Sequence, residues 1–157
     1  MIVTGIDPGL ARLGYGVIRV DRGGTAAPVC YGCIETRVGT RPAERLLSIY
    51  TDLQSLFDRY PPDALAMEKL FFSKNVTSAM GVSEVRGVVL LAAEQRKIPV
   101  TEYTPNQIKQ AITGSGRADK AQVQQMIQRL LRLDEIPKPD DAADGLSIAL
   151  CHIHVMR

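Results

Sequence analysis

The sequence predicts an α/β fold built on a five-stranded mixed sheet, because three strand-like runs come first and helices then alternate with two further short strands. The 157 residues, of which 45% are hydrophobic and 23% charged, have the length and apolar content of one compact unit, so we expect a single domain over 1–157. Candidate functional residues stand at the ends of these elements: Asp7, Glu68, Asp141 and Asp144.

The first three strand-like runs favour an antiparallel meander. Residues 1–7 are a short β-rich run that ends at Pro8-Gly9, and residues 13–20 alternate between the two faces of a second strand, with the tip between them at 11–13. A third strand follows at about 28–36, after the Asp-Arg-Gly-Gly turn at 21–24. Apolar residues then recur at helical spacing from Arg41-Pro42 until Tyr60-Pro61-Pro62 stops the helix.

The second half of the chain alternates helices and strands. The predicted ranges are a buried strand at 63–68, a helix at 75–95, a strand at 98–102, and helices from 105, from 119 to about 133 and from 140 to about 156. Thr104 suits the cap of the helix that begins at Pro105, since proline is favoured at the first helical position. Ser115-Gly116 separates the next helix, and Pro137 and Pro139 precede the last one.

Cysteine usage and the absence of a long apolar run indicate in which cellular compartment the protein is expected. Three cysteines, an odd number, in a domain that can build its own core argue against a disulfide framework, so we expect a cytoplasmic protein. Cys30 and Cys33 form a C-x-x-C pair, but a strand turns residues three apart to opposite faces, which disfavours a zinc site. No apolar run approaches the roughly 18 residues of a membrane span, so we expect no signal peptide and no anchor.

Two acids at strand ends are the first indication of a metal site. Asp7 ends its strand before Pro8-Gly9, where an acid could equally well hydrogen-bond a turn. Glu68 ends a buried strand, where an unpaired charge costs several kcal/mol, so a cation is its natural partner.

Asp141 and Asp144 lie three residues apart in the last helix, hence on one face of it. Acids in a first helical turn also interact favourably with the helix dipole, by about 0.3–1 kcal/mol each, which explains the pair less readily than a single acid. We expect Asp140 to point away from this face and to cap the helix. If the fold brings the pair to Asp7 and Glu68, their oxygens form a cage for Mg²⁺ or Mn²⁺.

Such a cage predicts chemistry on phosphate. Two divalent ions about 4 Å apart could bind one scissile phosphate, one activating water for in-line attack and the other stabilising the leaving 3′ oxygen. No protein nucleophile is then required, and the sequence contains no nucleophile elbow, Walker loop or H-E-x-x-H motif.

Five segments, in order along the chain, resemble the RuvC family of Holliday-junction resolvases. They are GIDPGLARLGYGVI at 5–18, AMEKLFFSKN at 66–75, SEVRGVVLLAA at 83–93, ADKAQVQQMI at 118–127 and DDAADGLSIALCH at 140–152. The resemblance implies a ribonuclease-H-like fold, a homodimer, and Mg²⁺-dependent nicking of two opposed strands of a four-way DNA junction. It further implies two ions in each active site, with Mn²⁺ able to replace Mg²⁺, and association with the RuvA and RuvB branch-migration proteins.

The resemblance also implies roles for individual residues. The positions that match metal-binding catalytic acids of the family are Asp7, Glu68, Asp141 and Asp144; some relatives have His at the position of Asp141. Lys109 and Lys120 match basic residues that the family uses near the scissile phosphate, and Lys120 is expected to contribute to catalysis. Phe71 matches an aromatic residue that wedges into the open junction centre, with Phe72 as the alternative.

The loop after Glu68 carries the remaining predicted DNA contacts, which are Lys69, Phe71, Phe72, Lys74 and Asn75. Exposed aromatic residues beside basic ones suit stacking on unpaired bases. The alternative is that the aromatic residues belong to the core. Lys69 and Lys74 flank the pair and could contact backbone phosphate.

The helix at 75–95 indicates an oligomer. Its apolar surface is wider than one stripe, so it is either buried on both sides or packed against a second subunit. A two-fold junction cut symmetrically requires a two-fold enzyme, which favours a dimer.

Three other functions share parts of this pattern. An ATP-dependent sugar kinase or actin-like protein also places D-x-G after a strand, but such proteins duplicate the fold, and 157 residues provide one copy. A nuclease of the same fold that acts on RNA or another nucleic acid, and a non-catalytic DNA-structure binder whose acids only cap and turn, are the remaining alternatives.

Overall fold

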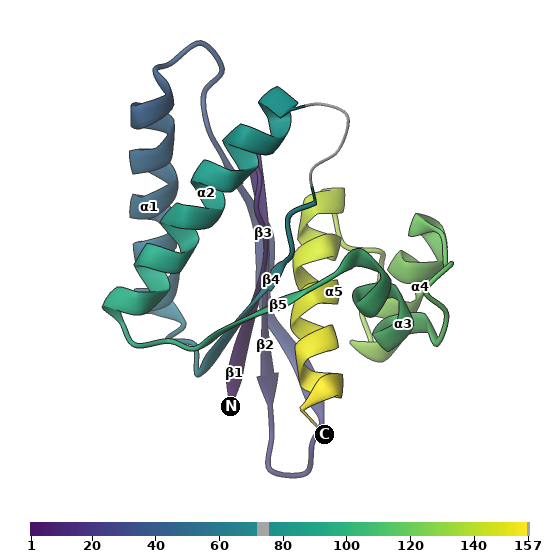
Figure 1. The fold of residues 1–157 in the computed structure, drawn as a ribbon. Coiled ribbons are helices and arrows are strands. Elements are labelled where there is room, and N and C mark those ends of the chain that lie inside the picture. Colours follow the sequence, from purple (N-terminus) through teal and green to yellow (C-terminus); the bar gives the residue numbers. More distant parts are fainter. Residues whose placement is uncertain (72–75, 157) are drawn as a thin grey trace.

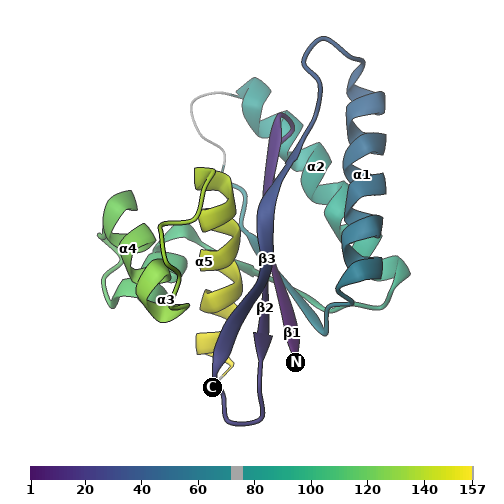
Figure 2. The same ribbon diagram turned by 180° about the vertical axis from the view of Figure 1, so that it is seen from behind.

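A five-stranded sheet lies between two layers of helices in the computed structural model, which describes residues 1–71 and 76–156 (Figure 1). The strands are β1 (Ile2–Asp7), β2 (Arg12–Val20), β3 (Ala26–Glu35), β4 (Ala64–Glu68) and β5 (Val100–Tyr103). The helices are α1 (Pro42–Arg59), α2 (Val76–Gln95), α3 (Pro105–Thr113), α4 (Lys120–Leu130) and α5 (Asp140–Val155). Helices α1 and α2 cover one face of the sheet, and α3, α4 and α5 lie on the other (Figures 1 and 2).

The strand order β3-β2-β1-β4-β5 confirms the predicted mixed sheet. β1, β2 and β3 pair antiparallel, and β4 and β5 continue the sheet in parallel from β1. Ile6 of β1 lies opposite Met67 of β4. Asp7 and Glu68, the next residue on each of these parallel strands, therefore leave the sheet at the same edge.

The predicted end of α4 and the predicted starts of β5 and β3 differ from the structure by two or three residues, and the other boundaries differ by less. α4 ends at Leu130 rather than near 133, and Arg132 has a φ of 53°, which an α-helix does not accommodate. β5 begins at Val100 rather than 98 because the N–H of Ile98 donates to Ala93 and completes the end of α2. β3 begins earlier than predicted, at Ala26.

Helix starts follow the sequence closely where a polar residue caps them. The Thr104 hydroxyl accepts from the N–H of Gln107, and the Gln107 side chain accepts from the N–H of Thr104, which forms a capping box at α3. Asp119 and Gln122 make the same pair of hydrogen bonds at α4. The predicted cap at Thr104 is therefore confirmed.

The backbone of α5 lies directly against β1 and β2. A Cβ atom on Gly14 of β2 would lie 2.0 Å from the carbonyl oxygen of Asp141, and one on Gly145 of α5 would lie 2.4 Å from the carbonyl carbon of Tyr15. Glycine is required at both positions, since any side chain would push the helix off the sheet. This contact seats the first turns of α5 beside the end of β1.

Helix α2 is unusually apolar. Within the described residues, it is the one helix that is long and apolar enough to cross a membrane, judged by length and composition alone. Val85 and Val89 are nevertheless buried in the protein core, and Arg86 forms an ion pair of 2.5 Å with Glu102 of β5. Core helices pass the same test, so its composition by itself does not indicate a membrane span.

Cys30 and Cys33 of β3 are free thiols at partly buried positions. Cys33 lies near Asp141 of α5, whereas Cys30 hydrogen-bonds Tyr60 beyond α1, and burial raises the pKa of both thiols. The two side chains therefore face opposite sides of the sheet, as the period of a strand predicts.

Candidate active site

The four acids predicted from the sequence converge at one edge of the sheet. Asp7 ends β1, Glu68 ends β4, and Asp141 and Asp144 lie in the first two turns of α5. Carboxylate oxygens of Asp7, Asp141 and Asp144 all lie within 4.8 Å of one another. Glu68 joins them through a side-chain hydrogen bond with Asp7. All four are partly buried, so their charges interact through protein as well as water.

The electrostatics of this cluster indicate that it holds either protons or cations. Burial, followed by the charges of Glu68 and Asp144, raises the pKa of Asp7 to about 8. Burial also raises the pKa of Glu68, although its hydrogen bond with Asp7 and the nearby Lys109 lower it. A hydrogen bond between two carboxyl groups requires one proton between them, so Asp7 and Glu68 share a proton when no cation is bound. Burial raises the pKa of Asp144 to about 6.

A divalent cation fits these residues. The donors are carboxylate oxygens, the ligands preferred by Mg²⁺, Mn²⁺ and Ca²⁺. Like charges this close are unfavourable unless a proton or a cation compensates them, and the raised pKa values of Asp7 and Asp144 record that cost. Asp7, Glu68, Asp141 and Asp144 are therefore called the carboxylate cage below.

The expectation that Asp140 caps α5 is wrong. Pro139 occupies the N-cap position, and α5 has no side-chain cap hydrogen bond. Asp140 instead lies 3.2 Å from the ammonium of Lys120 on α4 and accepts a hydrogen bond from Gln124. Because α4 packs beside the start of α5, the ammonium of Lys120 attracts the Asp140 carboxylate away from the N-terminus of α5. The same ammonium is 3.8 Å from Asp144, so Lys120 lies between the cage and Asp140.

Arg12 is a site residue that the sequence did not reveal. Its guanidinium lies 3.7 Å from Asp141 and 3.6 Å from Glu35 of the neighbouring strand. It stands two residues before Gly14, which pairs with Asp7, and residues two apart on a strand share a face. Counting along β2 from the predicted tip could have placed Arg12 on the side of Asp7.

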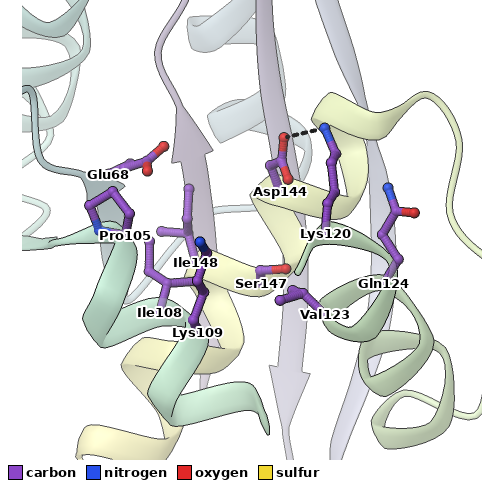
Figure 3. A pocket seen from close by; sticks show the side chains of 10 residues that line it. All are labelled: Glu68, Pro105, Ile108, Lys109, Lys120, Val123, Gln124, Asp144, Ser147 and Ile148. Carbon is purple, nitrogen blue, oxygen red and sulfur yellow. Dashed lines mark ion pairs between the residues drawn. The ribbon is translucent and has the colours of Figure 1, made fainter. Parts of the chain in front are cut away.

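The predicted DNA contacts are distributed around the cage. Lys69 and Phe71 line a hollow with Asp7 and Glu68, and the Phe71 side chain is 57% exposed, so the core alternative is wrong for it. Lys109 of α3 and Lys120 of α4 line a separate cavity that also borders the cage, shown in Figure 3. The predictions for Phe72, Lys74 and Asn75 lie outside the described residues.

Fold and site together define a class of protein: an α/β domain whose carboxylates could hold divalent ions for phosphoryl-transfer chemistry. The family model described as crossover junction endodeoxyribonuclease RuvC matches residues 3–152. The chain therefore belongs to the RuvC family.

Individual relatives cover almost the whole chain. A crossover junction endodeoxyribonuclease RuvC from Pseudothermotoga lettingae is 55% identical over 155 residues, which are 99% of this chain and 95% of the relative. The protein of the same description from Caldicellulosiruptor saccharolyticus is 51% identical over 153 residues, or 98% and 92%. The structure of Thermus thermophilus RuvC in complex with Holliday junction substrate matches with a TM-score of 0.94 at 37% identity, over 100% of this chain and 95% of that one. These neighbours confirm the ribonuclease-H-like fold.

Proposed function

We propose that this protein is a Mg²⁺-dependent endodeoxyribonuclease that resolves Holliday junctions by symmetric nicks in two opposed strands. The observation that carries the proposal is the convergence of four carboxylates from β1, β4 and α5 in a chain of the RuvC family. A relative of 37% identity has been solved with a Holliday junction substrate, which supports a four-way junction as the substrate here.

In this proposal the acidic residues bind metal ions and the basic residues interact with phosphate. The carboxylate cage would hold two Mg²⁺ ions, with Mn²⁺ as a substitute, and bound metal supplies an activated water and stabilises the leaving oxygen. Lys120, next to Asp144, contributes positive charge where negative charge develops on the phosphate. Lys109 is oriented toward the Glu68 side of the same cavity and is proposed to bind the strand backbone.

Phe71 is proposed to stack on unpaired bases at the junction centre. It is exposed, it borders the hollow beside Asp7 and Glu68, and Lys69 lies next to that hollow. The aromatic ring can stack on an unstacked base, and the neighbouring cation can interact with the phosphate of that nucleotide. Base stacking of this kind contributes about 1–3 kcal/mol.

A Phe71→Ala protein is expected to cleave the junction about tenfold more slowly while it binds the junction less than about threefold more weakly, because opening of the centre is needed for cleavage. Single-turnover cleavage and gel-shift titrations measure the two effects. Leu130→Ala, which removes an exposed apolar side chain of α4, is the matched control. Equal cleavage by Phe71→Ala and wild type would remove Phe71 from the mechanism.

A homodimer is proposed from the outer surface of α2. The structure excludes burial on both sides within one chain: Val76, Met80 and Leu91 are 62%, 58% and 56% exposed, and their spacing places them on one stripe. Exposed apolar stripes of this kind commonly mark subunit interfaces. The RuvA and RuvB proteins are proposed as further partners, on family membership alone.

Sedimentation at micromolar concentration is expected to give a dimer of the 17.2 kDa chain. Met80→Glu places a charge on the stripe and is expected to shift the protein toward monomer, whereas Val38→Glu, an exposed change in the loop before α1, is the control. A wild-type protein that sediments only as monomer would contradict the assignment of this surface.

Cleavage of a synthetic four-way junction tests the proposed function. With Mg²⁺, the purified protein is expected to introduce paired nicks at symmetric positions and to leave a linear duplex of the same sequence nearly intact. Binding without cleavage in either Mg²⁺ or Mn²⁺ would indicate a DNA-structure binder. Preferential cleavage of an RNA-containing duplex would indicate a nuclease of the same fold with another substrate.

A further inference from the structure

A cavity of about 270 Å³ adjoins the carboxylate cage on the side of α3 and α4 (Figure 3). Its apolar walls are Pro105, Ile108, Val123 and Ile148. Glu68 and Asp144 belong to both the cage and the cavity, and Lys109 and Lys120 line it as well. Its volume is near the lower end of the roughly 300–1,000 Å³ typical of small-molecule sites.

The uncharged polar side chains of this cavity are already engaged. The hydroxyl of Ser147 donates to the carbonyl of Ala143 at 2.8 Å, within its own helix. The amide of Gln124 donates to Asp140 at 3.2 Å. The cavity therefore offers apolar surface in its interior and charged groups where it meets the cage.

This distribution of chemistry matches one nucleotide unit. A nucleotide carries an apolar, planar base at one end and an anionic phosphate at the other. Glu68 and Asp144 border both the cage and the cavity. The nucleotide attached to a phosphate held at the cage would therefore lie at the entrance of the cavity. The ammonium groups of Lys109 and Lys120 complement the charge of that phosphate.

We propose that the cavity receives the sugar and base of one nucleotide next to the scissile phosphate; the inference rests on the proposed nuclease function. A base within a paired and stacked duplex cannot enter such a cavity, so the nucleotide must be unstacked first. Unstacking costs least where pairing is already open, as at the centre of a four-way junction. The cavity would thereby contribute to discrimination between junction and linear duplex.

The test combines a variant of the cavity wall with removal of single bases. A set of junctions of one sequence carries an abasic site at each position within two nucleotides of the cut, on either side. For the wild type, one such position is expected to reduce kcat/KM by about tenfold, the scale of losing an apolar contact in a binding pocket. Val123→Phe, which fills the cavity, is expected to reduce cleavage of the complete junction similarly.

The decisive result is the combination of the two changes. Val123→Phe is expected to cause no further loss on the junction that lacks the critical base, since both changes remove the same contact. Leu130→Phe, an equivalent enlargement on the exposed side of α4, is expected to behave like the wild type on every junction. Val123→Ala, which widens the cavity and disturbs packing less, is expected to show the same non-additivity and serves if Val123→Phe does not fold.

Two outcomes would overturn the inference while the proposed function stands: independent, multiplying effects of the variant and the missing base, or wild-type cleavage that tolerates every abasic position. A wild type that fails to cut the complete junction would contradict the proposed function itself.

Discussion

An Asp7→Asn protein is expected to cleave the four-way junction on the order of a thousandfold more slowly than the wild type. Asp7 contributes an oxygen within 4.8 Å of ligand atoms of Asp141 and Asp144, and it hydrogen-bonds Glu68, so it lies near every other member of the cage. Asparagine keeps the size of the side chain but removes its charge. The cage then loses the charged ligand that lies between Glu68 and the two helix-derived acids.

Binding separates this effect from loss of the fold. Asp7→Asn is expected to bind the junction within about twofold of the wild type, because phosphate contacts by lysine dominate affinity. Asp52→Asn removes an exposed acid from α1, on the opposite face of the sheet, and is expected to cleave normally. Gel-shift titration and single-turnover cleavage with Mg²⁺ measure the two properties. If Asp7→Asn cleaves at the wild-type rate, Asp7 is not a metal ligand.

Without divalent ions, the melting temperature of the wild type is expected to fall, relative to that of Asp7→Asn, as the pH rises from about 4 to about 8. The folded pKa of Asp7 is raised to about 8, whereas its unfolded pKa is near the ordinary value of about 4. Stability from such a group is fully present below the unfolded pKa and is lost as the pH rises through the folded pKa. Asp144, with a pKa raised to about 6, is present in both proteins, so its titration lowers the stability of both and is not the source of the difference between them.

The gap between the two proteins is expected to reach about 5 °C at pH 8 and to shrink toward pH 4, as measured by thermal melting in a chelator. Mg²⁺ added at pH 8 is expected to raise the melting temperature of the wild type more than that of Asp7→Asn, because it binds the folded cage. Asp52→Asn is expected to follow the wild type at each pH. Parallel curves for Asp7→Asn and wild type would show that Asp7 is not held at a raised pKa.

Local chemistry explains what could be predicted from the sequence. Asp7 and Glu68 could be placed because each ends a strand recognisable from its composition, and parallel pairing of β1 and β4 brings those ends together. Asp141 and Asp144 could be placed on one face because the helical period is fixed. The capping box of Thr104 with Gln107 likewise depends on neighbours in sequence alone.

The predictions that failed depend on contacts between distant segments. The role of Asp140 is decided by Lys120, twenty residues earlier, and by how α4 packs beside α5. Arg12, for which no role was predicted, meets Asp141 because β2 carries it to the start of α5; the alternation along β2 gives its face of the sheet but not this partner. The start of β5 likewise depended on a hydrogen bond from Ile98 back to the end of α2. Such outcomes follow from tertiary packing rather than from propensity.

The direct contact of α5 with the sheet has a consequence for the evolution of such a protein. Since the main chains of Gly14 and Gly145 meet their neighbours without intervening side chains, the separation between the helix-borne and strand-borne acids is set by backbone thickness. Apolar residues elsewhere can exchange volume without altering that separation. Sequence divergence in the core is thereby decoupled from the geometry of the cage, which agrees with a backbone preserved at a TM-score of 0.94 in a relative that shares 37% of its residues.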